Sequence, residues 1–213
     1  MMIDCKFTVQ ADGWCDGVLR DVSPYFDARP PGAGIELLVI HNISLPAGSF
    51  GTEHVANLFT GRLDYNADPS FAGLRQMEVS AHFLIRRDGA VLQFVSCNDR
   101  AWHAGVSEFQ GRAQCNQFSI GIEMEGSDFV AFTSLQYEVL SSLTLALQKR
   151  YQMAAVLGHQ HIAAGRKSDP GPFFDWARYE ALWQKAQAQG SMLVLTHAQL
   201  RFPAALEKVN LNR

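Results

Sequence analysis

A short apolar segment, IELLVIHN at residues 35–42, sets the architecture that we expect. Residues 35–40 form a nearly continuous run rich in branched apolar side chains, which is typical of a strand buried on both faces. The strand is predicted to end at His41 and Asn42. Because the loops that leave the carboxyl ends of strands in α/β sheets usually carry the chemistry, His41 is well placed for a functional role.

A hairpin and an alternating strand are expected downstream. Residues 79–86 and 90–95 flank an Arg-Asp-Gly turn, and Asp-Gly between two β-rich runs predicts two antiparallel strands. Residues 119–126 alternate apolar and polar side chains. This alternation predicts a half-buried strand that carries Glu123 and Glu125 together on its second face.

Two helices are predicted in the second half of the chain. Residues 133–136 form a capping-box pattern that begins a long helix. The apolar residues that recur at helical spacing down one face of this helix are Leu135, Val139, Leu143, Leu147 and Tyr151. A short buried strand is expected at residues 156–159, and a loop containing glycine and proline then leads to a helix near residues 175–189.

These elements predict an α/β fold, with a small mixed central sheet flanked by helices. The chain has 213 residues, which is enough for one typical domain with an extension. We place the domain at residues 25–189, with an N-terminal arm at residues 1–24. Residues 190–213 form a C-terminal extension, to which we give no role.

Composition and the N-terminal sequence indicate which partners and which cell compartment to expect. Hydrophobic residues make up 47% of the chain, charged residues 18%, and the net charge is -3 without a basic run, so we expect no nucleic-acid or anionic-membrane partner. The N-terminal residues lack an export signal and no apolar stretch approaches the roughly 20 residues of a membrane span, which predicts a soluble cytoplasmic protein. The four cysteines form no C-x-x-C pair and indicate reduced thiols, although two disulfides stay formally open.

Two histidines and one aspartate suggest a metal site. His41 and His159 each close a predicted buried strand, and Asp169 follows in a loop stiffened by Pro170 and Pro172. Two neutral imidazoles and a carboxylate are a typical three-ligand catalytic zinc set, with the fourth position left for water. Such a site predicts a hydrolase that uses activated water and needs no serine or cysteine nucleophile.

Spacing alone leaves other readings of these residues open. Any one of the seven histidines is more often a packed or surface residue than a ligand. His161 would face the same way as His159 if the strand continued through it. Cys97 or Cys115 could replace Asp169 as the third ligand.

Further side chains have the chemistry to assist such a site. Glu123 can take a proton from an activated water, although Glu125 shares its face and either carboxylate could instead serve in an ion pair or lie in solvent. Lys167, two residues before Asp169, can stabilise a tetrahedral oxyanion or can be an ordinary surface charge. Trp102 follows the hairpin and can stack on a sugar face or fill the core.

Seven motifs in order resemble one known family, the AmpD-type N-acetylmuramyl-L-alanine amidases, zinc enzymes related to phage amidases and peptidoglycan recognition proteins. The resemblance runs from about Tyr25 to about Tyr179. The motifs that carry it are Val39-Ile40-His41-Asn42-Ile43-Ser44, Ser80-Ala81-His82, Leu84-Ile85-Arg86-Arg87-Asp88-Gly89, Arg100-Ala101-Trp102-His103-Ala104-Gly105, Ser119-Ile120-Gly121-Ile122-Glu123-Met124-Glu125-Gly126, Gly158-His159 and Arg166-Lys167-Ser168-Asp169-Pro170-Gly171.

The resemblance implies roles for individual residues. His41, His159 and Asp169 are implied to ligate Zn²⁺, with Glu123 acting through the water and Lys167 supporting the oxyanion. Asp169 at the third ligand position resembles the cytoplasmic recycling branch, in which the enzyme cleaves the bond between 1,6-anhydro-N-acetylmuramic acid and L-alanine of the stem peptide.

The same resemblance implies a muropeptide as the small-molecule partner and places Asn42, Trp102 and Ala163 beside it. This chain departs from the family in having Glu78 and Gln114 where relatives carry arginine. Arginine captures a carboxylate with two hydrogen bonds, and neither glutamate nor glutamine supplies that fork. Arg112 is a candidate substrate contact that could compensate, as could Arg75.

Two other functions use the same fold. A muropeptide-binding module would keep the groove without hydrolysis, but the complete ligand set with Glu123 and Lys167 argues against it. A partner-regulating protein would require an exposed apolar patch or a dedicated segment, and only the C-terminal extension offers one. We therefore expect a monomeric zinc amidase of cell-wall recycling.

Overall fold

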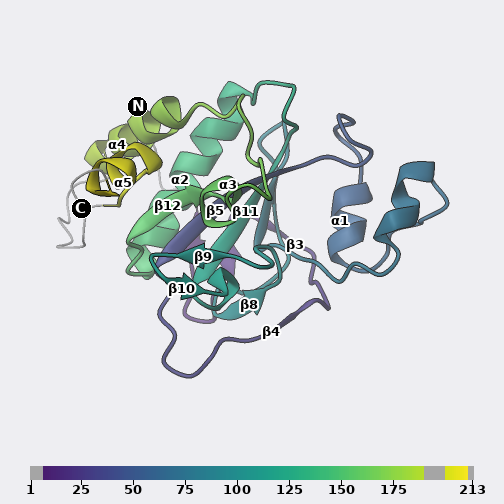
Figure 1. The fold of residues 1–213 in the computed structure, drawn as a ribbon, viewed down its shortest axis with the longest axis horizontal. Helices are drawn as coiled ribbons and strands as arrows, with labels where there is room; N and C mark the ends of the chain where they lie inside the picture. The colour runs from purple at the N-terminus through teal and green to yellow at the C-terminus, as the bar shows by residue number, and fades with distance from the viewer. Residues whose placement is uncertain (1–6, 190–199, 211–213) are drawn as a thin grey trace.

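A six-stranded sheet runs through the middle of the molecule (Figure 1), in the order β12-β5-β11-β6-β7-β3. The computed structural model describes residues 7–189 and 200–210. The strands are β1 (Thr8–Val9), β2 (Cys15–Asp16), β3 (Leu19–Arg20), β4 (Phe26–Ala28), β5 (Leu37–Ile43), β6 (Phe83–Ile85), β7 (Val91–Gln93), β8 (Asp99–Ala101), β9 (Glu108–Phe109), β10 (Arg112–Ala113), β11 (Ser119–Glu125) and β12 (Ala155–Gly158). The helices are α1 (His54–Phe59), the 3₁₀ helices η1 (Pro69–Leu74) and η2 (Cys115–Gln117), α2 (Ser134–Arg150), α3 (His159–Ile162), α4 (Trp176–Gln189) and α5 (Pro203–Asn210).

The sheet is mixed, which confirms the predicted fold class. Strands β12, β5, β11 and β6 run parallel to one another, whereas β7 runs antiparallel to β6. The β6–β7 hairpin is the one predicted from the Asp-Gly turn, and Gly89 adopts the left-handed φ of +79° there. The paired segments are shorter than predicted, at three residues each.

The parallel register determines which side chains lie level across the sheet. Glu123 on β11 lies opposite His41 on β5. Side chains with even numbers on these strands, such as Ile40 and Ile122, belong to the core formed with α2. Leu37 and Val39, with odd numbers, belong to a separate core on the other face. Strand alternation therefore puts His41 and Glu123 together on the face away from α2.

Strand β11 differs from the prediction of a half-buried strand. All seven of its residues are buried, because β5 and β6 flank it and both faces are covered. Gly121 is part of that cover: a Cβ built there would lie 2.4 Å from Cγ of His103. The glycine lets the His103 ring lie directly against the sheet. Strand β5 begins at Leu37 and ends at Ile43, one residue beyond the predicted end at His41 and Asn42.

The capping box of helix α2 is confirmed. Thr133 Oγ1 accepts from the Gln136 backbone N–H, and Gln136 Oε1 accepts from that of Thr133. Leu143 and Leu147 are fully buried, but Leu135 is 45% exposed and lies against the hairpin turn instead. Helix α4 packs on α2, and Trp183 donates to Gln148 across this contact.

The described parts of both chain ends pack on this core. Arg201 extends the β12 edge through backbone hydrogen bonds with Ala154 and Val156, and Leu200 and Phe202 are buried. Residues 190–199 lie outside the described part, and the domain boundaries at 24/25 and 189/190 stay predictions. Within residues 7–189 and 200–210, helices of the length and apolarity needed to cross a membrane are absent.

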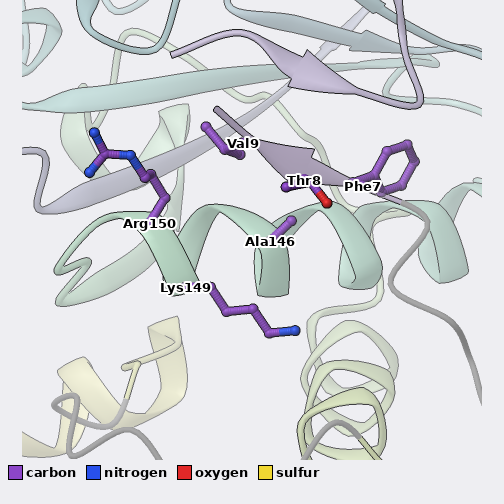
Figure 2. A pocket seen from close by; sticks show the side chains of 6 residues that line it. All are labelled: Phe7, Thr8, Val9, Ala146, Lys149 and Arg150. Atoms are coloured by element: carbon purple, nitrogen blue, oxygen red, sulfur yellow. The ribbon is translucent and has the colours of Figure 1, made fainter. Parts of the chain in front are cut away.

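A cavity of about 160 Å³ lies between β1 and the C-terminal half of α2 (Figure 2). It is on the α2 side of the sheet and therefore belongs to the opposite face from His41. Its lining residues are Phe7, Thr8, Val9, Ala146, Lys149 and Arg150.

Candidate metal centre

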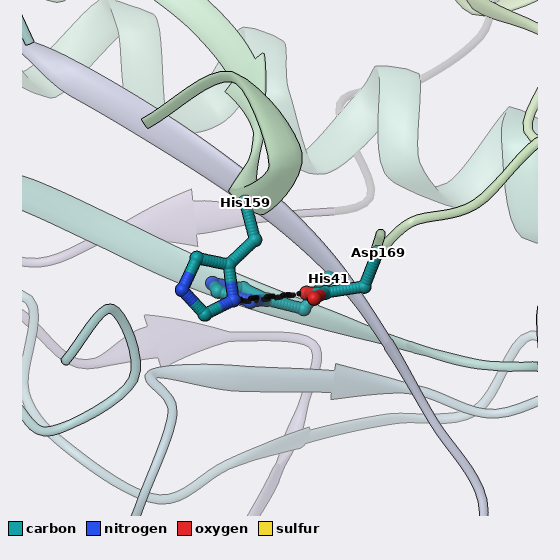
Figure 3. Close-up of side chains that lie close together, drawn as sticks. All are labelled: His41, His159 and Asp169. Carbon is teal, nitrogen blue, oxygen red and sulfur yellow. Dashed lines mark hydrogen bonds and ion pairs between the residues drawn. The ribbon is translucent and has the colours of Figure 1, made fainter. Parts of the chain in front are cut away.

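The three side chains predicted as metal ligands converge on one point (Figure 3). Asp169 Oδ2 lies 2.9 Å from His41 Nδ1 and 3.1 Å from His159 Nδ1. The two Nδ1 atoms are themselves 3.1 Å apart. Each ligand comes from a different element: His41 from β5, His159 from the first residue of α3, and Asp169 from the loop that follows α3.

The start of α3 at His159 resolves one alternative. The predicted strand does not continue, so His161 turns away from His159 and its Nδ1 accepts a hydrogen bond from the Gly158 backbone N–H at 2.8 Å. Its ring packs on Trp176 instead. Among the described residues, the metal-capable group contains only His41, His159 and Asp169, so neither His161 nor the buried Cys97 and Cys115 join it.

The outer hydrogen bonds of the histidines leave the inner nitrogens free for a cation. His159 Nε2 lies 3.1 Å from the Ala104 carbonyl oxygen, which can only accept, so this nitrogen carries the hydrogen. The lone pair of His159 then lies on Nδ1 and faces the Asp169 carboxylate. Two acceptors 3.1 Å apart repel each other unless a cation lies between them. The donor set therefore fits a divalent metal with nitrogen and oxygen ligands.

The surroundings of His41 and Asp169 favour the protonation states that bind a metal, a neutral imidazole and an ionised carboxylate. Burial lowers the pKa of His41 and outweighs the opposing effect of the nearby Asp169 carboxylate, which keeps the imidazole neutral. Burial by itself raises the pKa of Asp169, but the nearby imidazoles of His159 and His41 outweigh it and hold the pKa below its usual range. The His41 and His159 side chains are 2% and 4% exposed and that of Asp169 is 16%, so the cluster opens to solvent beside Asp169.

Glu123 is the carboxyl group left for chemistry beside this cluster. It is 8% exposed, and its Oε2 has no hydrogen-bond partner among the described residues. Burial and then the charge of Asp169 raise its pKa well above the usual range, against the opposing charge of Lys167. A buried carboxyl with a raised pKa and an unused oxygen is suited to exchange protons with a bound water.

Glu125 has a different task, although it shares the face of Glu123. Its Oε1 accepts the Gly51 backbone N–H at 2.6 Å, and its Oε2 accepts that of Arg87 at 2.9 Å. Both oxygens are therefore used to hold two loops against the end of β11.

Lys167 is exposed on the loop between α3 and Asp169. Its charge acts on both Glu123 and His41, which places the ammonium group within electrostatic range of the cluster. Among the described salt bridges, Lys167 has no ion pair that would neutralise its charge.

The candidate substrate contacts lie at different distances along the chain from the metal ligands. Asn42 Nδ2 donates to Asp128 at 2.8 Å, next to the ligand His41, and Ala163 is the buried C-cap of α3. Trp102 precedes His103, and its Nε1 donates to Asp27 at 3.2 Å.

Arg112 is not brought to the cluster. It pairs with Glu36 at 2.7 Å, at the end of β5 opposite to His41, and its guanidinium lies over Phe118. Arg75 binds Asn66. Glu78 and Gln114 are both exposed.

Sequence reasoning missed Asp128. This half-buried carboxylate accepts from Asn42 Nδ2 and, at 2.6 Å, from Ser168 Oγ, so it ties the neighbour of ligand His41 to the neighbour of ligand Asp169. Gly171 allows this close approach, since a Cβ there would lie 2.3 Å from Asp128 Oδ1. Periodicity carries no sign of such a link, because Asp128 lies in a turn after β11.

A mixed α/β sheet with two histidines, one aspartate and a buried glutamate at one face is typical of a metal-dependent hydrolase. Residues 31–172 match the family model described as N-acetylmuramoyl-L-alanine amidase, and the chain belongs to this family of metal amidases. The 1,6-anhydro-N-acetylmuramyl-L-alanine amidase AmpD of Citrobacter freundii is 54% identical over 173 residues, which are 80% of this chain and 92% of that protein. The AmpD of Escherichia coli K12 is 52% identical over 175 residues, 81% of this chain and 96% of that protein.

The fold agrees with these relatives. The crystal structure of a selenomethionine derivative of AmpD matches with a TM-score of 0.79 at 51% identity, covering 82% of this chain and 99% of that one. The chain is thus an amidase of this family with a single α/β domain.

Proposed function

We propose that this enzyme hydrolyses the amide bond between 1,6-anhydro-N-acetylmuramic acid and the L-alanine of the stem peptide. The observation that carries the proposal is the convergence of His41, His159 and Asp169 on the sheet face that carries Glu123, whose Oε2 has no hydrogen-bond partner among the described residues. The relatives that cover most of the chain bear the name of this activity. The proposal includes a muropeptide as the partner, a monomeric state, and a place in cytoplasmic recycling of cell-wall fragments.

We propose zinc as the resident metal, held by His41, His159 and Asp169. In a three-ligand site of this kind, zinc supplies an activated water and polarises the carbonyl under attack. Nitrogen and carboxylate ligands in a mostly buried cluster suit this ion. The opening beside Asp169 is the side from which substrate approaches.

The chain's own residues then handle the protons and the charge. Glu123 accepts the proton that the attacking water loses and passes it to the alanine nitrogen as the amide C–N bond breaks. Lys167, with its ammonium group in range of the cluster, offsets the negative charge on the former carbonyl oxygen. Asn42 and Trp102 border the bound sugar and peptide, and Ala163 lines the same rim.

Mass spectrometry of a purified 1,6-anhydro-N-acetylmuramyl tripeptide tests the proposal. Incubation with the protein is expected to give the free sugar acid and the free peptide, whose masses sum to the substrate plus one water. Removal of metal by a chelator is expected to stop the release, and added zinc to restore it. The Asp169→Ala variant is expected to be inactive under all three conditions. The N-acetylmuramyl tripeptide without the anhydro bond, run in parallel, measures sugar preference.

Two outcomes would reject the proposal. An unchanged substrate mass with bound ligand would make the protein a binding module. Full turnover by the metal-free protein, or by Asp169→Ala, would remove the role given to the cluster.

A further inference from the structure

Residues 103 and 104 supply the outer contacts of both ligand histidines. His103 Nδ1 lies 2.9 Å from His41 Nε2, and the Ala104 carbonyl oxygen lies 3.1 Å from His159 Nε2. The His103 and His41 rings meet edge to face, with their centroids 5.1 Å apart. One dipeptide, which is not among the metal-capable residues, thus supports both imidazoles from behind.

This dipeptide is held in place from several sides. Asn116 Oδ1 accepts the backbone N–H groups of His103 and Ala104, at 3.2 and 2.8 Å. Ser119 Oγ lies 3.2 Å from His103 Nε2. Gly121 provides the space in which the ring lies, because any larger residue would collide with it. A side chain with this many fixed contacts cannot turn without cost.

The positions of the hydrogens follow from the chemistry of the cluster. A metal at His41 Nδ1 needs the lone pair there, so the hydrogen of the neutral ring must lie on Nε2. The hydrogen-bond partner that the structure gives this N–H is His103 Nδ1. That nitrogen must then present a lone pair, so the His103 hydrogen lies on Nε2 and is donated to Ser119 Oγ.

We propose that His103 is a positioning residue of the metal centre: by accepting the Nε2 hydrogen of His41, and by being held through Ser119, it selects the form of His41 that presents Nδ1 to the metal. The proposal rests on the zinc centre proposed above. Partners of this kind, in contact with a ligating imidazole, typically contribute about 10- to 100-fold in metal affinity. The alternative is that His103 only fills space against β11.

Two nearly isosteric substitutions separate these roles. In His103→Asn, an amide oxygen can take the place of Nδ1 and still accept from His41. In His103→Leu, a branched side chain of similar size fills the space but accepts nothing. The measurement is zinc affinity, by competition with a chromogenic chelator, alongside thermal unfolding of each metal-free protein. A space-filling role predicts equal zinc affinity for the two variants.

We expect His103→Leu to bind zinc about 10- to 100-fold more weakly than the wild type. His103→Asn is expected to keep zinc affinity close to that of the wild type, and Ser119→Ala to give a smaller loss than His103→Leu. Equal affinity for His103→Leu and the wild type, or equal weakness of the Asn and Leu variants, would overturn the proposal.

The test also includes a replacement variant and a wild-type titration. If His103→Leu does not fold, His103→Gln replaces it, because glutamine can reach Ser119 but lacks an acceptor at the Nδ1 position. The wild type is titrated first: failure of the wild type to bind zinc contradicts the proposed function, whereas normal wild-type binding with an unaffected Leu variant contradicts only the role of His103.

Discussion

The two faces of strands β5 and β11 have different tasks. The face toward α2 is mostly apolar, and Leu38, Ile40 and Ile122 are fully buried there. The opposite face buries His41, whose ring nitrogens lie close to His103, His159 and Asp169, and Glu123, whose Oε2 has no hydrogen-bond partner among the described residues. Because a strand alternates its side chains, one strand can stabilise the fold with one face and tolerate costly polar groups on the other.

The largest expected effect comes from the polar face. Glu123→Gln removes the proton acceptor while keeping the shape of the side chain, so kcat for anhydromuropeptide cleavage should fall about 100- to 10,000-fold. Because burial raises the pKa of Glu123 in the folded state, the neutral amide should not lower the midpoint of thermal unfolding. Steady-state kinetics and calorimetry check both. A lower unfolding midpoint with an unchanged kcat would show that Glu123 stabilises the fold and does not take part in catalysis.

The apolar face should show the converse. Ile122→Ala, next to Glu123 in sequence but on the α2 side, opens a cavity in the core and should lower the free energy of unfolding by about 2–5 kcal/mol. Denaturant titration measures this loss. The kcat of the folded protein should stay near the wild-type value, and a large fall in kcat would show that the two faces are coupled.

Glu125 sharpens the comparison within the polar face itself. Glu125→Gln can accept only one of the two backbone N–H groups that the carboxylate accepts, which should cost about 1–3 kcal/mol of stability. Its kcat should remain far above that of Glu123→Gln. Similar kcat values for the two variants would mean that either carboxylate serves as the base.

The smallest effect is expected at Thr133, the N-cap of α2. Thr133→Ala removes the cap on the Gln136 N–H and should lower stability by about 1 kcal/mol, as judged by chemical denaturation. Zinc affinity should not change, because the cap has no contact with the cluster. Thr133→Ser keeps the hydroxyl and is the matched control, expected to retain most of the stability.

Local patterns predicted most of the framework. The Asp-Gly turn, the capping box and the apolar run before His41 each depend on residues close in sequence, and the hairpin, α2 and β5 follow them. The prediction for β11 was wrong in burial, because the cover on its second face comes from the distant His103 ring. Leu135 fitted the helical spacing yet lies against the hairpin turn, which no helical pattern records.

The candidate site was also predicted in part from the sequence, and the rest required the structure. His41, His159 and Asp169 were predicted together because two lie near strand ends and one in a stiff loop, and the family motifs contain all three. The choice between His159 and His161 depended on where β12 ends and α3 begins, which the sequence did not show. The distinction between Glu123 and Glu125 needed the two loops that use both oxygens of Glu125.

The sequence by itself determined the kinds of element, their order and the residues able to bind a metal, because periodicity, turn chemistry and ligand type are local properties. Tertiary structure alone decided which of those residues meet and what stands behind them: the pairing of β5 with β11, the link through Asp128, and the contact of His103 with His41. These depend on parallel strand register and on segments dozens of residues apart, and no local pattern encodes such distances.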